Sequence, residues 1–339
     1  MTDVVIVSHS HPALKHGGGE VAAYRQYQHL REQGVDATFV GAVIGYEESH
    51  RFLGPDQRAV SLSDSDFLIR SHGMDAFMMD QPDPEFETWL TNFFTRLDAD
   101  IYHFHHFWNI GAGTIRRLRA ARPDALMLCT LHEFTAICAN HGQMVKTGSN
   151  RLCYEAETLA CATCVKDRPP IDHMLRRSRM TDMLAQFDHL ISPSHFLRQR
   201  FIEWGIAPDR ISMIENGVPF ERGGLRPSAE RLKELSSEFA VFCQATPTKG
   251  LDVLVEAARL IEAEAQVSTI TINVFGSSEE EFAAIWPEIE IPTNVRFHGR
   301  YAPENVIKLM STAGWILMPS VWWENSPVII QEALAAQVP

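Results

Sequence analysis

Residues 315–336 read WILMPSVWWENSPVIIQEALAA, and this stretch contains a complete strand–loop–helix unit. Its continuous apolar run Trp315–Met318 predicts a β-strand that is buried on both faces. Ser326 suits a helix cap and Pro327 the first helical turn, so we expect a helix over Val328–Ala336. A buried strand that leads through a short loop into a helix is the repeating unit of parallel α/β sheets.

The same alternation of apolar runs and amphipathic stretches recurs along most of the chain. It predicts two consecutive parallel sheets, each covered by helices, and the loop-forming residues 221–228 separate them. We therefore expect two doubly wound domains, residues 1–221 and residues 222–339. The other predicted strands are Val4–Val7, Ala37–Val40, Ile101–Phe104, Leu126–Leu131, Leu190–Ser192, Val241–Ala245, Ile270–Phe275 and Val295–Phe297. The other predicted helices are Glu20–Arg31, Thr114–Ala121, Leu175–Phe187, Phe196–Trp204, Leu251–Ala263 and Glu304–Ser311.

The segment from Gly45 to Asp98 departs from this alternation, because its aromatic residues stand among Ser, Asp and Pro. We expect it to form an irregular lobe that fills core. It includes Asp64-Ser65-Asp66, which together with Asp98-Ala99-Asp100 mimics a D-x-D motif known from metal-dependent enzymes. Both pairs precede predicted strands in loop-like surroundings, so we interpret them as solvated turns.

The composition excludes several classes of protein. With 339 residues, 45% of them hydrophobic and 22% charged, the chain is globular rather than disordered or fibrous. Its net charge of −13 offers no general attraction to phosphate backbones, so we expect no nucleic-acid partner. The chain begins Met1-Thr2-Asp3 without a basic signal-peptide region, and the apolar run Val4–Val7 is far too short to span a membrane. These features predict a cytoplasmic protein.

Two glutamates, Glu324 and Glu332, stand with seven residues between them on either side of the predicted helix start. Backbone N–H groups at a helix N-terminus can bind an anion without a basic side chain. Glu332 could then accept hydrogen bonds from ribose hydroxyls, while Glu324 faces a sugar or a phosphate. Taken alone, the spacing favours two solvated glutamates.

Several further motifs favour a functional interpretation of Glu324 and Glu332, because they occur together with these glutamates in a characteristic order. They are Gly17-Gly18-Gly19-Glu20, His132-Glu133, Ile191-Ser192-Pro193-Ser194-His195-Phe196, Ile214-Glu215-Asn216-Gly217-Val218 and Lys249-Gly250-Leu251-Asp252. Together with Pro319–Ala333, this series resembles the signature of retaining family 4 glycosyltransferases of the GT-B fold. The resemblance covers almost the whole chain. It implies two Rossmann-like domains that face each other across a cleft.

The resemblance also implies roles for individual residues. His132, Glu324 and Lys249 would be catalytic: His132 would contact the transferred sugar, and Lys249 would balance charge on the departing diphosphate. The glycine loop would let backbone approach the diphosphate or the acceptor closely. The implied donor-binding residues are Gly18, Gly19, Asn216, Gln244, Lys249, Asn325, Ser326, Pro327, Val328 and Glu332.

Two departures from the family pattern stand out. The family usually has an arginine five positions before the lysine, where this chain has Gln244, whose neutral amide cannot offset charge. Family members also continue beyond the position of Pro339 with a further strand, a glycine-rich loop and a last helix. The C-terminal domain is therefore expected to be incomplete, as in a fragment of a longer enzyme.

The implied activity is transfer of a sugar from a UDP- or GDP-sugar to a hydroxyl of a glycan or lipid-linked acceptor, with retention and without a catalytic metal. Polysaccharide or glycolipid synthesis is the expected setting. Basic helical stretches, Arg116–Arg119 and Leu175–Arg179, could contact anionic lipid at the inner face of the membrane, although solvated faces are commoner. Two rivals keep the fold: a GT-B protein that binds a nucleotide or a partner without transfer, and a nucleotide-sugar epimerase.

Four cysteines, Cys138, Cys153, Cys161 and Cys164, lie in a loop-like stretch after His132. Their pattern C-x14-C-x7-C-x2-C ends in a common chelating pair and suits structural zinc, which we favour over an iron–sulfur cluster or four separate thiols. Four thiolates leave no open position for water, so such a zinc would brace the loop.

The histidines His103, His105 and His106 give a second metal-like pattern, since two of the imidazoles share one face of a strand. With no third ligand identified, we expect these side chains to line a cleft or to be packed in the core. A metal hydrolase built on them is the weakest alternative.

Overall fold

The computed structural model describes residues 2–14, 17–71, 73–217, 229–264 and 270–339. The chain divides into two compact units, Met1–Gly217 and Val218–Pro339. The boundary predicted between residues 221 and 222 falls outside the described residues.

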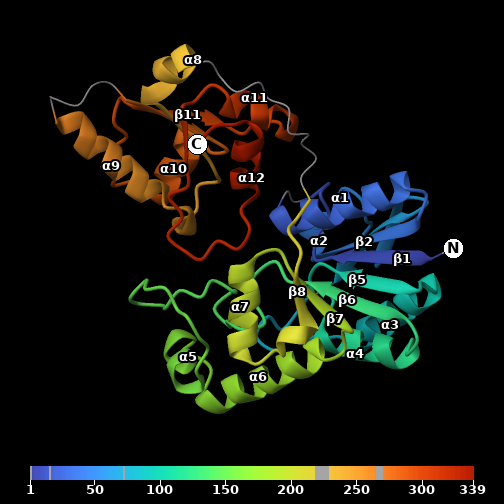
Figure 1. Cartoon of the computed structure of the whole chain (residues 1–339). Helices are drawn as coiled ribbons and strands as arrows, with labels where there is room; N and C mark the ends of the chain where they lie inside the picture. The colour runs from blue at the N-terminus through green and yellow to red at the C-terminus, as the bar shows by residue number, and fades with distance from the viewer. Residues whose placement is uncertain (1, 15–16, 72, 218–228, 265–269) are drawn as a thin grey trace. The chain divides into compact units, whose positions relative to one another are not determined.

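The first unit is built on an eight-stranded sheet in the order β3-β4-β2-β1-β5-β6-β7-β8. All neighbouring strands are parallel except the antiparallel pair β3 and β4. Figure 1 shows β2, β1, β5, β6 and β7 side by side in this order. The strands are β1 Asp3–Ser8, β2 Asp36–Ile44, β3 Ala59–Ser63, β4 Asp66–Ser71, β5 Ile101–Phe104, β6 Leu126–Thr130, β7 His189–Ser192 and β8 Ile211–Met213.

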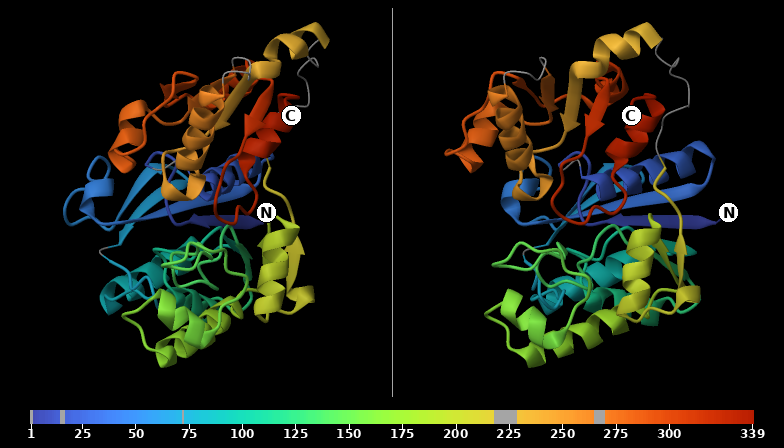
Figure 2. Two further views of the ribbon diagram at one scale, coloured as in Figure 1. Left: turned by 90° about the vertical axis from the view of Figure 1, so that its left-hand side faces the viewer. Right: turned by 60° about the vertical axis from the view of Figure 1, so that its left-hand side comes forward.

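Helices connect these strands, as the alternation predicts. They are α1 Gly18–Glu32, α2 Tyr46–Ser49, α3 Pro84–Leu97, α4 Ala112–Ala121, α5 Thr158–Cys164, α6 Pro170–Leu184 and α7 His195–Trp204, with a 3-10 turn at Pro208–Arg210. Helix α1 packs on β1 and β2, whereas α4 lies against both α3 and α6. Between β6 and α5 the chain runs as an irregular green coil in Figure 2.

The strand order reverses direction at β1, which gives the first sheet its topological switch point. From β1 the chain moves to β2 on one side and later returns to β5 on the other. Right-handed crossovers then place the connecting helices on opposite faces of the sheet. The crevice beyond the carboxyl ends of β1 and β5 is where sheets of this kind bind ligands.

The prediction of an irregular lobe over residues 45–98 is wrong. Strands β3 and β4 extend the sheet at its edge, and β4 pairs with β2 along Asp66–Ser71. Helix α3 follows, with the Asp83 side chain capping its start and Phe86, Leu90 and Phe94 buried on one face. The i, i+4, i+8 spacing of these three residues is a helical signal that the surrounding polar residues obscured.

The second unit has a four-stranded parallel sheet in the order β11-β10-β9-β12. Its strands are β9 Glu238–Phe242, β10 Thr271–Phe275, β11 Val295–Gly299 and β12 Trp315–Leu317. Its helices are α8 Ala229–Glu234, α9 Leu251–Ala263, α10 Glu279–Ile285, α11 Val306–Met310 and α12 Val328–Ala335, with 3-10 turns at Leu235–Ser237, Pro247–Lys249 and Pro303–Asn305. The order reverses at β9, so the switch point of this sheet lies between β9 and β12.

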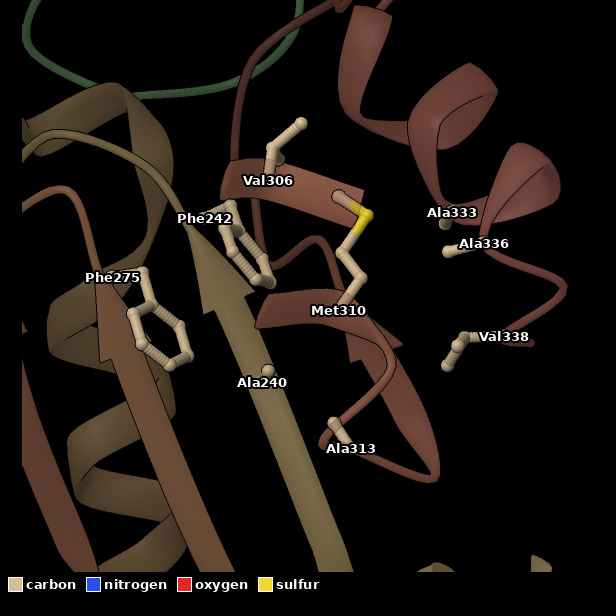
Figure 3. Close-up of a cluster of buried hydrophobic side chains, with 9 residues drawn as sticks. All are labelled: Ala240, Phe242, Phe275, Val306, Met310, Ala313, Ala333, Ala336 and Val338. Carbon is tan, nitrogen blue, oxygen red and sulfur yellow. The ribbon is translucent and has the colours of Figure 1, made fainter. Parts of the chain in front are cut away.

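Helix α12 is held against the second sheet by a cluster of buried apolar side chains (Figure 3). Met310 is fully buried at 0% exposure, and Ala333 of α12 and Ala336, the residue after this helix, belong to the same cluster. Phe242 and Phe275 stack from adjacent strands with ring centroids 4.8 Å apart. The small alanines allow α12 to approach closely, which fixes the position of the adjacent Glu332.

Among the residues that the structure describes, no helix is both long enough and apolar enough to cross a lipid bilayer.

Candidate functional site

Imidazole and carboxylate side chains crowd the carboxyl ends of the central strands in the first unit. Each group follows a strand that ends at the switch point or next to it. They are His9 and His11 after β1, His105 and His106 after β5, and His132 and Glu133 after β6. Since parallel strands end at one edge, three segments far apart in sequence converge here.

His132 packs against the first turn of α1 at Gly19. A β-carbon added at Gly19 would lie only 3.3 Å from the His132 Cγ atom, whereas one added at Gly18 would meet no atom within 4 Å. A side chain at position 19 would therefore press on the His132 ring. The structure brings these two predicted residues together.

His132 also forms a hydrogen bond with His105, whose Nδ1 atom lies 2.9 Å from the Nε2 atom of His132. Burial, with a smaller contribution from the neighbouring imidazoles, lowers the pKa of His132 to about 3. Burial likewise lowers the pKa of His105 well below its ordinary value. Both imidazoles are therefore neutral at physiological pH.

Two carboxylates face this cluster and each contacts a histidine. His9 Nε2 lies 3.1 Å from Glu20 Oε1, and His106 Nε2 lies 2.9 Å from Glu133 Oε1. Burial raises the pKa of Glu133, but contacts with His106 and Thr135 outweigh it and leave the pKa lowered. Burial also lowers the pKa of His106, so a neutral imidazole donates to an ionised carboxylate.

His11 makes a further contact that the sequence interpretation missed. Its Nε2 atom lies 3.1 Å from Asp66 Oδ1, and the Tyr24 hydroxyl donates to Asp66 Oδ2 at 3.0 Å. Asp66 is 4% exposed, so its assignment to a solvated turn is wrong. Asp64, at the exposed tip of the β3–β4 hairpin, fits that interpretation, and so do the exposed Asp98 and Asp100 before β5. The available signal was the apolar run 67–69 directly after Asp66, which places Asp66 at the start of β4, between β3 and β2.

In the second unit two residues predicted to be catalytic, Lys249 and Glu324, meet at the switch point. Lys249 lies in the 3-10 turn after β9, and Glu324 lies in the loop after β12. Glu324 Oε1 accepts hydrogen bonds from Lys249 Nζ at 2.6 Å, Ser320 Oγ at 2.7 Å and Trp322 Nε1 at 2.9 Å. Burial raises the pKa of Glu324, but these donors outweigh it and the net pKa is lowered. Glu324 is thus ionised and paired with Lys249.

Glu332 lies close to Tyr301, which in turn lies close to Cys243, a neighbour of Lys249 and Glu324. Burial together with the charges of Glu332 and Cys243 raises the pKa of Tyr301 to about 12. Burial also raises the pKa of Cys243 to about 11, where Lys249 lowers it and Glu324 raises it. Both glutamates of the E-x7-E pattern therefore act on groups around Cys243.

The start of α12 differs from the prediction. Pro327 occupies the cap position and the helix begins at Val328, so the assignment of Ser326 as the cap is wrong. The side chains of Asn325, Ser326, Pro327 and Val328 are half-buried on the approach to this helix. Glu332 lies inside the helix as predicted.

The remaining predicted donor residues are divided between the two units. Gln244 is exposed just after β9. Asn216 and Gly18 belong to the first unit, near its last described residue and at the start of α1.

The four cysteines of the connection after β6 lie near one another as thiols that are not paired in disulfides. Burial and the neighbouring Cys138, Cys153 and Cys164 raise the pKa of Cys161 to about 11. Within the described ranges, however, no group of three or more His, Cys, Asp or Glu side chains is arranged to hold a metal ion. The described arrangement does not fit the predicted zinc site, and the histidine cluster forms no metal site either.

Comparisons with known proteins agree with this geometry. The sequence profile of Glycosyltransferase Family 4 matches residues 16–222, and that of Glycosyl transferases group 1 matches residues 229–339. The amylovoran biosynthesis glycosyltransferase AmsK of Erwinia amylovora is 24% identical over 162 residues, 46% of this chain. That match spans 39% of the length of AmsK.

Two similar solved structures cover the whole chain. Anabaena HepE in complex with UDP is 14% identical, with a TM-score of 0.62 over 100% of this chain and 79% of that one. Sucrose-phosphate synthase from Thermosynechococcus elongatus is also 14% identical, with a TM-score of 0.64 over 100% of this chain and 80% of that one. At this identity the likeness establishes the fold. The chain belongs to Glycosyltransferase Family 4 and has the GT-B fold.

Proposed function

We propose that this chain transfers a sugar from a nucleotide-sugar donor to an acceptor hydroxyl with retention at the anomeric carbon. The observation that carries the proposal is the contact of Lys249 with Glu324 at the carboxyl ends of β9 and β12. A cation at this crevice can receive a diphosphate, and Glu324 beside it can receive a sugar hydroxyl.

In the proposed reaction the acceptor oxygen forms a bond to the anomeric carbon on the face from which the diphosphate leaves. The bond from that carbon to the phosphate oxygen breaks, and the acceptor proton passes to the departing phosphate. Lys249 offsets the charge that develops there. His132, in the first unit, accepts a hydrogen bond from the transferred sugar. Catalysis then rests on positioning and charge stabilisation.

The donor is a nucleotide sugar, and UDP-sugars are the first candidates. HepE was solved in complex with UDP and with UDP-glucose, which supports a uridine nucleotide here. GDP-sugars are the second candidates. The name of AmsK supports an acceptor in polysaccharide synthesis.

A thermal-shift panel of UDP, GDP, ADP and dTDP, with and without their sugars, tests the donor site. A ligand at 100 to 1,000 times its Kd adds about 3 to 4 kcal/mol of apparent stability. One nucleotide should shift the wild type and shift Glu332→Ala much less. No shift with any nucleotide would contradict the donor site.

Two rival functions are separated by turnover. A GT-B protein that only binds would show the nucleotide shift without any product. An epimerase would convert the donor without an acceptor. Release of nucleotide that depends on an acceptor, and that persists in EDTA, supports a transferase without a catalytic metal.

We propose that the acceptor is a glycan, either free or linked to a lipid. We also propose that this protein works in the cytoplasm, at the inner face of the membrane. A surface pocket of about 500 Å³ is lined by Arg116, Arg117 and Arg179 together with Asp80 and Glu87. Next to it, α6 exposes apolar side chains that a membrane surface could cover. They are Ile171, Met174 and Leu175, each about half exposed.

Co-sedimentation with vesicles tests this contact. Binding to phosphatidylglycerol vesicles, but not to phosphatidylcholine vesicles, should weaken in Arg116→Glu and in Leu175→Ser. Exposed Arg296→Glu, in the second unit, is the control. Equal binding of all variants would contradict the contact.

The metal content stays a prediction. Elemental analysis of purified protein should find one equivalent of zinc if Cys138, Cys153, Cys161 and Cys164 rearrange around it. Clearly less than one equivalent of zinc or iron would contradict the prediction.

A further inference from the structure

The side chain of Gln26 links two histidines of the cluster in the first unit. Gln26 lies on α1, with its Nε2 atom 3.1 Å from His103 Nδ1 and its Oε1 atom 2.6 Å from His105 Nε2. His103 Nε2 in turn lies 2.8 Å from Thr130 Oγ1. One amide therefore contacts a ring nitrogen of each histidine.

An amide has a fixed polarity, since its nitrogen only donates and its oxygen only accepts. The Gln26 oxygen requires a proton on His105 Nε2, and the Gln26 nitrogen requires a lone pair on His103 Nδ1. A neutral imidazole carries a proton on one nitrogen only. His103 therefore donates from Nε2 to Thr130, and His105 keeps a lone pair on Nδ1.

That lone pair determines the tautomer of His132. The rings of His105 and His132 have centroids 5.2 Å apart and planes 20° apart, with 2.9 Å between the two nitrogens. The centroid separation equals the nitrogen–nitrogen distance plus two ring radii, so the rings meet edge to edge. His132 must donate from Nε2, and its Nδ1 atom keeps a lone pair.

We propose that Gln26 is a positioning residue that holds His132 in the tautomer with its proton on Nε2 and its lone pair on Nδ1. This relay of hydrogen bonds runs from Gln26 on α1 through His105, the first residue after β5, to His132, the second residue after β6. Its catalytic meaning rests on the proposed function: His132 Nδ1 accepts a hydrogen bond from a sugar hydroxyl. If the Gln26 amide were turned by 180°, the tautomers of His103, His105 and His132 would all be reversed. The orientation of this single amide therefore decides which nitrogen of His132 carries the proton.

The tautomer can be measured by long-range 1H–15N correlation spectra of protein labelled with 15N-histidine. The His132 signals are assigned from their loss in His132→Gln. In the wild type, the proton of His132 should be on Nε2. A proton on Nδ1 would overturn the proposal without reference to any variant.

Two substitutions separate the relay from simple packing. Gln26→Glu keeps an oxygen toward His105 but offers another to His103, so the His132 tautomer should persist while that of His103 reverses. Gln26→Leu removes both contacts, and His132 should become a mixture of tautomers. Gln28→Leu, at an exposed position two residues further along α1, is the matched control. An unchanged His132 tautomer in Gln26→Leu would refute the relay.

Kinetics then connect the relay to turnover. Gln26→Leu should lower kcat by about tenfold, the loss expected when one hydrogen bond from the transferred sugar to His132 is no longer made, with little change in the KM for the donor. Gln28→Leu should leave kcat unchanged. The NMR result does not depend on activity, so absence of turnover in all variants would contradict the proposed function and leave the tautomer result to decide the relay.

Discussion

Lys249 Nζ lies 2.6 Å from Glu324 Oε1, although the two residues are 75 positions apart in the sequence. Lys249 follows β9 and Glu324 follows β12, which are neighbours in the second sheet. Without a ligand, the carboxylate balances the cation. A bound diphosphate would compete with Glu324 for Lys249. Substitution of Lys249 and substitution of Glu324 should therefore have opposite effects on the affinity for a nucleotide diphosphate.

Lys249→Met should weaken nucleotide diphosphate binding, because a charge-assisted hydrogen bond is lost. Such bonds contribute about 1.5 to 3 kcal/mol, which corresponds to roughly a 10- to 150-fold increase in Kd. Glu324→Gln should bind the nucleotide as tightly as the wild type or more tightly, because Lys249 is no longer paired. Isothermal titration calorimetry measures both. Lys308→Met, on the exposed face of α11, is the control, and equal Kd values for Lys249→Met and Lys308→Met would count against the site.

Gly19→Ala and Gly18→Ala form a matched pair at the start of α1. A methyl group at Gly19 would press on the His132 ring at 3.3 Å, whereas one at Gly18 enters open space. Overpacking costs about 1 to 3 kcal/mol, so the free energy of unfolding of the first unit should be lower in Gly19→Ala than in Gly18→Ala. Gly18→Ala should leave it unchanged or raise it, since alanine is the better helix former by up to about 1 kcal/mol. Urea denaturation checks both; equal stabilities would show that His132 does not rest on Gly19.

The first unit should lose stability in mild acid. Burial lowers the pKa of His103 to about 4 and that of His132 to about 3, against an ordinary 6.5. Because the unfolded chain binds protons first, their contribution is complete above about pH 6.5 and is lost as pH falls toward these values. The slope approaches about 1.4 kcal/mol per pH unit for each such histidine.

Hydrogen exchange of the β5 and β6 amides at pH 7 and pH 5 measures this effect in the first unit alone. His103→Asn should reduce the difference between the two pH values. His29→Gln should not change it, because the His29 side chain is 69% exposed. Exchange rates that show the same stability at both pH values, once corrected for intrinsic exchange, would contradict burial of the neutral imidazoles.

Met310→Ala should destabilise the second unit. Met310 is fully buried in the cluster of Figure 3, and removal of such a side chain costs about 2 to 5 kcal/mol. Leu334→Ala, at 71% exposure on α12, should change stability by less than about 0.5 kcal/mol. Thermal unfolding followed by tryptophan fluorescence compares them, and similar losses in both variants would contradict the assigned core.

Much of the fold could be predicted, because buried parallel strands carry an unambiguous local signal. Ile101–Phe104 and Leu251–Ala263 were predicted with the bounds that the structure has. Residues 45–98 could not be predicted in the same way. Strand β3 has an edge position and exposed Ser side chains, so it lacks the continuous apolar run of a central strand.

The residues of the candidate site likewise fall into those that the sequence pointed to and those that it did not. Lys249, Glu324 and His132 were singled out because each belongs to a motif with a characteristic neighbourhood; the structure brings Lys249 and Glu324 into contact, and the roles of all three stay predictions. Gln26 and Asp66 could not be singled out in this way, because each acts through a contact with a histidine that is remote in sequence. The cysteine spacing predicted a metal site that the described side chains do not form.

By itself the sequence determined the strand–helix alternation, the two units and the motifs at the strand ends, because periodicity and turn chemistry are local properties. Only the tertiary structure decided that Gln26 contacts both His103 and His105, and that His105 contacts His132. These contacts depend on strand order and register, since β1, β5 and β6 must lie side by side to bring their following residues together. Such long-range pairing follows from the packing of the whole sheet and leaves no local pattern in the chain.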